Sequence, residues 1–181
     1  MDALTCLKPR RSVRAYEERQ VEEALLAQVL EAGMYAPTGM GRQSPKMVVV
    51  QDPATRDQLS RMNAAVMNGS GDPFYGAPTV IVVLADPAVG TWREDGALVM
   101  GNLMNAAHAV GLGSCWIHRA YEEFQSQEGK TLLKKWGVPE NYVGVGHCIL
   151  GYGQGEPRPP KERKADYVVL SLIHISEPTR H

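Results

Sequence analysis

The sequence contains few cysteines and no long apolar run. Its three cysteines, Cys6, Cys115 and Cys148, form no CxxC pair, which argues against a disulfide framework. The longest uninterrupted apolar stretch, from Val80 to Ala85, is far shorter than the roughly 20 residues that span a bilayer. The N-terminus carries no apolar stretch ahead of a cleavage site, as a secretory signal would. We therefore expect a cytoplasmic protein with no membrane partner.

The sequence also lacks an excess of charge of either sign. Its 181 residues include 19 Lys and Arg and 20 Asp and Glu, which gives a formal net charge of −1, and 44% of them are hydrophobic. The neutral total argues against a general nucleic-acid binder, and the hydrophobic content argues against disorder as the main state. The basic residues are nevertheless concentrated, because residues 8–14 and 158–164 hold eight of the 19. Two basic segments in an otherwise acidic chain therefore need an explanation.

Several common site motifs are missing as well. Residues 151–155 (GYGQG) lack the third glycine of a dinucleotide fingerprint and run into Pro157 instead of a helix. Cys115 and His118 could supply two zinc ligands, but no second pair stands at ligand spacing. A cysteine–histidine nucleophile pair would also need an orienting third group that the sequence does not show. We therefore predict neither a metal ion nor a catalytic side chain.

Hydrophobic patterning predicts helices that alternate with a few strands. An apolar stripe at helical spacing predicts a helix over Val21–Met34, and Asp52-Pro53 starts another that runs to about Val66. The run Thr79–Leu84 is apolar throughout, as in a strand buried on both faces, and Glu94–Val110 gives the strongest helix pattern. The other predicted elements are strands at 46–51, 114–117, 143–150 and 167–169, and a helix at 129–136. This alternation predicts an α+β or α/β sandwich with helices over a small sheet.

The first basic segment has the residue types of a phosphate site. Residues 9–14 (PRRSVR) are too short and too clearly proline-led to form a helix face, and in extended backbone Arg10, Ser12 and Arg14 point to one side. A guanidinium fork matches phosphate oxygens bidentately, and a serine hydroxyl adds a further donor. A solvated basic arm is the alternative, and the residues alone leave both interpretations open.

The second basic segment, residues 157–164 (PRPPKERK), is stiffened by its prolines into extended chain. Lys161 and Arg163 then lie on one side of it. Two such segments that converge on one dianion would account for both. The residue types alone assign no role to the other basic residues of the two segments, which are Lys8, Arg11, Arg158 and Lys164.

The end of the chain, residues 170–181 (LSLIHISEPTRH), continues no pattern found upstream. It resembles translated vector sequence more than natural coding sequence. We therefore expect residues 1–169 to form a single domain and residues 170–181 to be a non-native tail.

Five motifs follow one another in a fixed order along the chain. They are RRSVR at 10–14, YAPTGMGRQSP at 35–45, GAPT at 76–79, GLGSCWI at 111–117, and LGY at 150–152 followed by the second basic segment. Together they resemble the FMN-dependent nitroreductase family, over residues 4–169. No single motif is diagnostic, but their order is.

The resemblance implies an α+β sandwich in which helices flank a mostly antiparallel central sheet. Two chains would form an intertwined homodimer, with a C-terminal strand of each completing the sheet of the other. FMN would be bound at the dimer interface. NADH or NADPH would be the co-substrate, and a small electron-poor molecule would be the acceptor.

The resemblance also assigns residues to the FMN site. The positions that match the phosphate ligands are Arg10 and Ser12, with Arg11 beside them, and Lys161 and Arg163. Arg14 matches a basic residue at the N1 and C2 carbonyl edge of the flavin. The loop that reaches FMN from the partner subunit is matched by Pro37, Thr38, Gly39 and Gln43. The segment beside the ring, near its N5 edge, is matched by Cys115, Trp116 and Ile117.

Two positions match less closely. Asn68 is a weaker match for an amide at the pyrimidine end, and Gly41 stands where many members have Asn.

The implied activity needs no catalytic side chain, because FMN carries the hydride chemistry at N5. NAD(P)H would reduce the flavin, and a nitroaromatic, a quinone or a similar acceptor would reoxidise it in a ping-pong cycle. Arg14 would add electrostatic support. The alternatives are a specialised flavin-dependent relative of the dehalogenase or dehydrogenase type, and a non-catalytic protein that binds flavin or a phosphorylated ligand.

Overall fold

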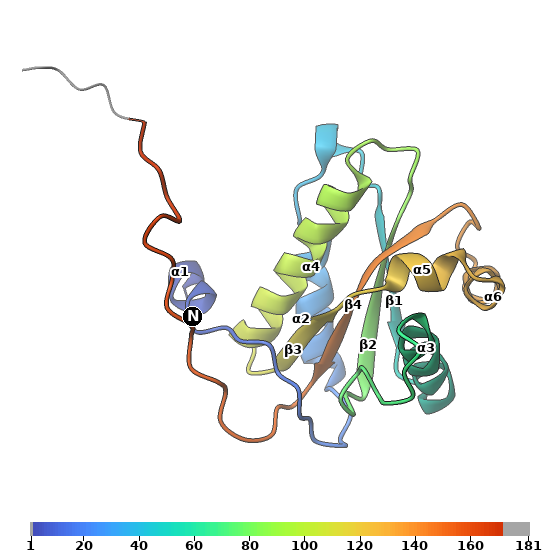
Figure 1. The fold of residues 1–181 in the computed structure, drawn as a ribbon, viewed down its shortest axis with the longest axis horizontal. Coiled ribbons are helices and arrows are strands. Elements are labelled where there is room, and N and C mark those ends of the chain that lie inside the picture. The colour runs from blue at the N-terminus through green and yellow to red at the C-terminus, as the bar shows by residue number, and fades with distance from the viewer. Residues whose placement is uncertain (1, 172–181) are drawn as a thin grey trace, which may run out of the picture.

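The computed structural model describes residues 2–171, in which helices cover both faces of an antiparallel sheet (Figure 1). The strands are β1 (Pro45–Val50), β2 (Thr79–Ala85), β3 (Gly113–Ile117) and β4 (Val143–Gly151). The helices are α1 (Ala3–Leu7), α2 (Glu23–Met34), α3 (Pro53–Val66), α4 (Trp92–Ala109), α5 (Ala120–Gln125) and α6 (Gln127–Lys135), with a 3₁₀ turn η1 (Gly39–Gly41). This is the α+β architecture that the sequence predicts.

The described sheet has the strand order β1-β2-β4-β3, and each neighbouring pair is antiparallel. All seven residues of β2 are buried, because this apolar strand lies inside the sheet with a helix layer on each face. Its alternate residues serve two cores. Val80, Val82 and Leu84 pack with α3, α5 and α6, whereas Ile81 and Val83 pack with α2 and α4.

Most predicted elements agree with the observed ones to within two residues at each end. The prediction of a strand at 167–169 is wrong for the single chain, since these residues are exposed and pair with no described strand. A strand needs a neighbour to satisfy its backbone groups, and none lies beside this segment. The short helices α1 and α5 were not predicted, because five or six residues are too few to show helical periodicity.

Residues 9–16 of the N-terminal segment run along the edge of the sheet. Val13 donates its backbone amide to the Ser114 carbonyl at 3.0 Å. Its side chain lies between two glycines: a Cβ added at Gly113 would be 2.9 Å from Val13, and one added at Gly153 would be 3.2 Å away. Only residues without a Cβ allow so close an approach. The first basic segment is thereby held where β3 begins and β4 ends.

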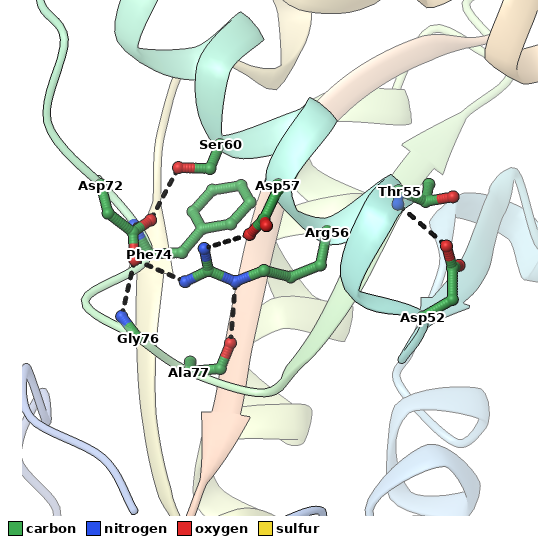
Figure 2. Close-up of polar contacts among 9 residues, drawn as sticks. All are labelled: Asp52, Thr55, Arg56, Asp57, Ser60, Asp72, Phe74, Gly76 and Ala77. Carbon is green, nitrogen blue, oxygen red and sulfur yellow. Dashed lines mark hydrogen bonds and ion pairs between the residues drawn. The ribbon is translucent and has the colours of Figure 1, made fainter. Parts of the chain in front are cut away.

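A cluster of polar contacts fixes the loop between α3 and β2 (Figure 2). Arg56 Nη2 and Ser60 Oγ donate to the Asp72 carboxylate at 2.6 and 2.7 Å. The same carboxylate accepts from the backbone amides of Phe74 and Gly76 at 2.9 and 2.7 Å. Partial burial raises the pKa of Asp72, but these four hydrogen bonds outweigh burial and hold the pKa below its ordinary value.

Replacing Asp72 with Asn is expected to lower the free energy of unfolding at pH 7 by about 1–2 kcal/mol, because it removes the charge that four donors share. A carboxyl group whose pKa is lowered by folding stabilises the fold above its unfolded pKa, about 3.9, and loses that contribution as the pH falls through the folded pKa. The difference between wild type and Asp72→Asn in urea unfolding should therefore shrink below about pH 4.

Asp57→Asn is the matched control. Asp57 contacts the same Arg56 guanidinium, but its side chain is 61% exposed. It should cost less than about 0.5 kcal/mol. Equal effects of the two substitutions at pH 7 would contradict the special role of Asp72.

Candidate functional site

A cavity of about 460 Å³ lies where the first basic segment, the end of α4, the start of β3 and the chain after β4 meet. We call it the arginine cavity, and its polar lining residues are Arg10, Arg11, Ser12, Arg14, His108, Ser114, Gln154, Glu156 and Arg158. Four arginines against one glutamate make its lining positive at neutral pH. The structure thus brings together four residues that the sequence assigns to cofactor binding: Arg10, Arg11, Ser12 and Arg14.

Three side-chain nitrogens in the lining of the arginine cavity are buried without a partner. Arg10 Nη1, Arg11 Nε and His108 Nε2 are shielded from solvent and have no hydrogen-bond partner among the described residues. A buried donor left unpaired costs about 1–3 kcal/mol, and more when it is charged, so the site favours an acceptor from outside the chain. Arg11 is partly paired within the chain, because its Nη1 donates to the carbonyls of Lys8 and Arg10 while its Nε has no partner. A ligand with several anionic oxygens, such as a phosphate monoester, fits this set of donors.

The residues predicted to lie beside the flavin ring are on β3, next to the arginine cavity. Ser114 lines the cavity, and Cys115, Trp116 and Ile117 follow it along the strand. Cys115 and Ile117 are buried, whereas Trp116 is half-buried. On the adjoining strand β4, burial raises the pKa of the Cys148 thiol to about 12, so that Cys148 is not a thiolate nucleophile at neutral pH.

The loop predicted to reach FMN from the partner subunit lies at the end of α4 that is remote from the arginine cavity (Figure 1). This loop contains η1 and is fixed to the first turn of the helix, whereas the arginine cavity adjoins the last turn. Between Asp95 and His108 the helix rises about 20 Å. One chain therefore does not bring this loop to the arginine cavity. The predicted residues of the loop are Pro37, Thr38, Gly39 and Gln43, and two of them line a separate cavity of about 150 Å³.

Asp95 fixes this loop to α4. The residue is 2% exposed, and its carboxylate accepts from the Gly39 amide at 2.8 Å and from Ser44 Oγ at 2.7 Å. Thr91 Oγ1 donates to it at 3.2 Å. Burial alone would raise the pKa of Asp95, but the hydrogen bonds, led by the one from the Gly39 amide, outweigh burial. The pKa of Asp95 is therefore below its ordinary value, and the group is charged at neutral pH. A side chain at position 39 would overlap Thr91, which explains the glycine there.

The predicted residues Asn68, Lys161 and Arg163 also lie outside the lining of the arginine cavity. Asn68 follows α3 with a φ of 54° and is exposed. Lys161 and Arg163 lie in exposed chain without regular secondary structure after β4, while Arg158 of the same segment lines the cavity. His108 lines the arginine cavity but is not predicted from the sequence, because it belongs to the apolar stripe of its helix. A lone imidazole on such a stripe was the available signal.

The nitroreductase family model matches residues 7–152, which include most of the arginine cavity and all four strands. The chain belongs to the nitroreductase family. It is 33% identical over 159 residues to a protein of Archaeoglobus fulgidus named as an NADH dehydrogenase/NAD(P)H nitroreductase, a match that covers 83% of this chain and 87% of that protein.

Solved structures of nitroreductases have the same fold. This chain resembles an FMN-bound nitroreductase from Bacteroides fragilis with a TM-score of 0.86 at 30% identity, and 94% of this chain and 98% of that one are covered. It resembles an FMN-bound nitroreductase from Desulfitobacterium hafniense with a TM-score of 0.84 at 25% identity and the same coverage. These matches confirm the predicted family and its α+β sandwich.

The described residues contain neither a cluster of metal ligands nor a helix that could cross a membrane. No group of three or more His, Cys, Asp and Glu side chains in residues 2–171 is placed to hold a metal ion. Within the same range, none of the helices combines the length and the apolar character that crossing a membrane requires. The predicted tail lies, from residue 172 onward, outside the described residues.

Replacing Asp95 with Asn is expected to lower the free energy of unfolding by about 1–3 kcal/mol. The substitution removes the negative charge of the carboxylate, and the NH₂ group of Asn would face groups that donate to Asp95. Hydrogen exchange of the Gly39 amide should become faster, since that amide donates to Asp95. Glu94→Gln is the control, because Glu94 lies in the same helical turn and is exposed. An unchanged exchange rate at Gly39 in Asp95→Asn would contradict the anchoring role.

Proposed function

We propose that this nitroreductase-family chain transfers hydride from NADH or NADPH through FMN to an electron-poor acceptor such as a nitroaromatic or a quinone. The observation that carries the proposal is the arginine cavity, whose unpartnered donors Arg10 Nη1 and His108 Nε2 suit an anion with several oxygens. The names of relatives support it. Proteins of Archaeoglobus fulgidus and Methanothermobacter thermautotrophicus are named as NAD(P)H nitroreductases, and one of Bacillus subtilis is named as an FMN reductase.

The arginine cavity would hold the FMN phosphate. Arg10 and Ser12 line it and would donate to phosphate oxygens. Lys161 and Arg163 follow closely after Arg158, which lines the same cavity, and we propose them as further phosphate ligands. When bound, FMN supplies the acceptance of hydride from the nicotinamide and its delivery to the acceptor.

Arg14 would support the flavin electrostatically. It lines the arginine cavity and also lies over the ring of Tyr75, with 6.0 Å between the guanidinium carbon and the ring centroid. A permanent positive charge at the pyrimidine edge would favour the electron-rich state of the ring. Asn68 belongs to the same loop as Tyr75, and we propose its amide for the same edge. The segment Cys115–Ile117 on β3 would lie along the ring.

A second copy of the chain would complete each site. The loop around η1 is fixed to the first turn of α4, about 20 Å along the helix from His108 in the cavity lining, and this separation favours contact with the FMN of another copy. Large apolar side chains next to this loop are exposed in the single chain, as an interface would require: Met34 is 73% exposed, Tyr35 80% and Met40 87%. We therefore propose a homodimer in which Pro37, Thr38, Gly39 and Gln43 contact the FMN of the partner.

The state of the cysteines supports a reducing compartment. Cys6, Cys115 and Cys148 are all buried and free. Free thiols are the rule in the cytoplasm, whereas secreted proteins pair them. We accordingly propose that the protein acts in the cytoplasm.

The purified protein is expected to bind FMN and turn yellow, and to lose that colour under NADH or NADPH without oxygen. A nitroaromatic or a quinone should then restore the oxidised spectrum. Binding of FMN without bleaching by either nicotinamide would point to a non-catalytic flavin-binding protein. A protein that FMN neither colours nor stabilises against heating would contradict the proposal.

Arg10→Ala is expected to raise the dissociation constant of FMN about tenfold or more, because it removes a charge-assisted phosphate contact of about 1.5–3 kcal/mol. Arg163→Ala should act in the same way. Arg14→Ala should instead slow reduction by NAD(P)H more than it weakens FMN binding. FMN titration and stopped-flow reduction of FMN-saturated protein measure the two effects separately. Lys8→Ala, at an exposed position outside the cavity lining, is the control.

Unchanged FMN affinity in both Arg10→Ala and Arg163→Ala would contradict the phosphate assignment. Comparable losses of affinity and reduction rate in Arg14→Ala would refute its electrostatic role.

A further inference from the structure

His108 is a cavity residue to which the family resemblance gives no role. It lies in the last turn of α4 and lines the arginine cavity together with Arg10 and Ser12. Its Nε2 atom is shielded from solvent and has no partner among the described residues, which is also true of Arg10 Nη1. An imidazole carries a donor on each nitrogen when it is protonated. His108 can therefore donate to an anion that Arg10 also binds.

The end of α4 adds partial negative charge to this side of the cavity. The helix has 18 residues and ends at Ala109, so that its carbonyl terminus faces the region of His108. A phosphate dianion near that terminus is disfavoured, whereas an imidazolium in the last turn is attracted both to the terminus and to the phosphate. A protonated His108 would thus offset the unfavourable part of placing a dianion there.

The charged neighbours of His108 make this effect depend on the ligand. From the first basic segment and from the chain after β4, the charged groups that line the cavity with it are Arg10, Arg11, Arg14, Glu156 and Arg158. From the side of α1, Cys6 donates to the carbonyl of Asn105 on α4, and Lys8 is exposed. The arginines stay charged throughout the neutral range and repel an imidazolium, but a bound dianion reverses the balance.

We infer that His108 is a proton-dependent ligand of the FMN phosphate, so that binding of the phosphate is coupled to protonation of the imidazole. The inference rests on the proposed FMN site in the arginine cavity. Histidine is the side chain that ordinarily changes charge between pH 5 and 8, while the arginines do not. FMN affinity therefore has a pH-dependent part that originates in this one residue.

The test is a titration of wild type and His108→Gln with FMN and with riboflavin, at pH 6.0 and at pH 8.5, followed by flavin fluorescence. Glutamine keeps a neutral donor and removes only the charge. The substitution is expected to raise the dissociation constant of FMN about tenfold at pH 6.0 and less than about twofold at pH 8.5. Riboflavin has no phosphate, so its dissociation constant should change by less than about twofold at both pH values.

His118→Gln is the matched control, since His118 is an exposed histidine outside the lining of the arginine cavity. It should leave the preference for FMN over riboflavin as in wild type at both pH values. The phosphate of FMN itself changes protonation near pH 6, but this affects all variants alike and cancels from their ratios. His108→Asn replaces His108→Gln if the latter does not fold.

Equal loss of FMN affinity at both pH values, equal loss for riboflavin, or no loss at all would overturn the role of His108. Wild-type protein that binds neither flavin would overturn the proposed function and this inference with it. Wild-type protein that binds FMN while His108→Gln behaves identically would overturn the inference alone.

Discussion

The arginine cavity depends on the passage of Val13 between Gly113 and Gly153. A Cβ at either glycine would come within 2.9 to 3.2 Å of the Val13 side chain, closer than side chains pack without a shift. The backbone bond from Val13 to Ser114 fixes the same crossing point. The residues on either side of Val13 therefore meet the start of β3 and the chain after β4. The cavity is a consequence of backbone packing, and its charges come from the residues on that backbone.

The buried polar groups of the molecule differ in how they are satisfied. Asp95 is buried with three donors from its own chain, and Glu123 is buried against His147 and Asn63. Around the arginine cavity the donors exceed the acceptors. Among the described residues, three of the five buried polar atoms without a partner belong to its lining: Arg10 Nη1, Arg11 Nε and His108 Nε2. This concentration of unpartnered nitrogens in one positively charged lining suits an anion, and an anion bound there would also stabilise the fold.

Patterns within a single element could be predicted from the sequence. The apolar residues of strand β2 and helix α4 indicate that these elements are buried, and the basic residues of 9–14 indicate an anion site. Contacts between distant elements could not be predicted in the same way. Glu123 and His147 are 24 positions apart and meet only because α5 packs on β4.

In the candidate site, too, the residues within one segment could be predicted, whereas those placed by contacts between distant elements could not. Arg10, Ser12 and Arg14 could be identified from one segment, because guanidinium and hydroxyl groups that suit a phosphate stand close together in the chain. His108 belongs to the cavity through the relative placement of α4 and the N-terminal segment, which no local pattern encodes. Residues 158–164 have no regular secondary structure, so no periodicity in the sequence predicts which of them line the cavity: Arg158 does, whereas Lys161 and Arg163 do not.

Helix α4 connects the two halves of the proposed site. Asp95, in its first turn, holds the loop that would reach a second copy, and His108, in its last turn, lines the cavity of its own chain. In a two-fold symmetric dimer each α4 then contributes to both sites, at one end through a fixed loop and at the other through a side chain. Because a helix is rigid over about 20 Å, a shift of α4 against the sheet would displace both contributions together. The apolar packing of α4 on the sheet is therefore a requirement of the site as well as of the fold.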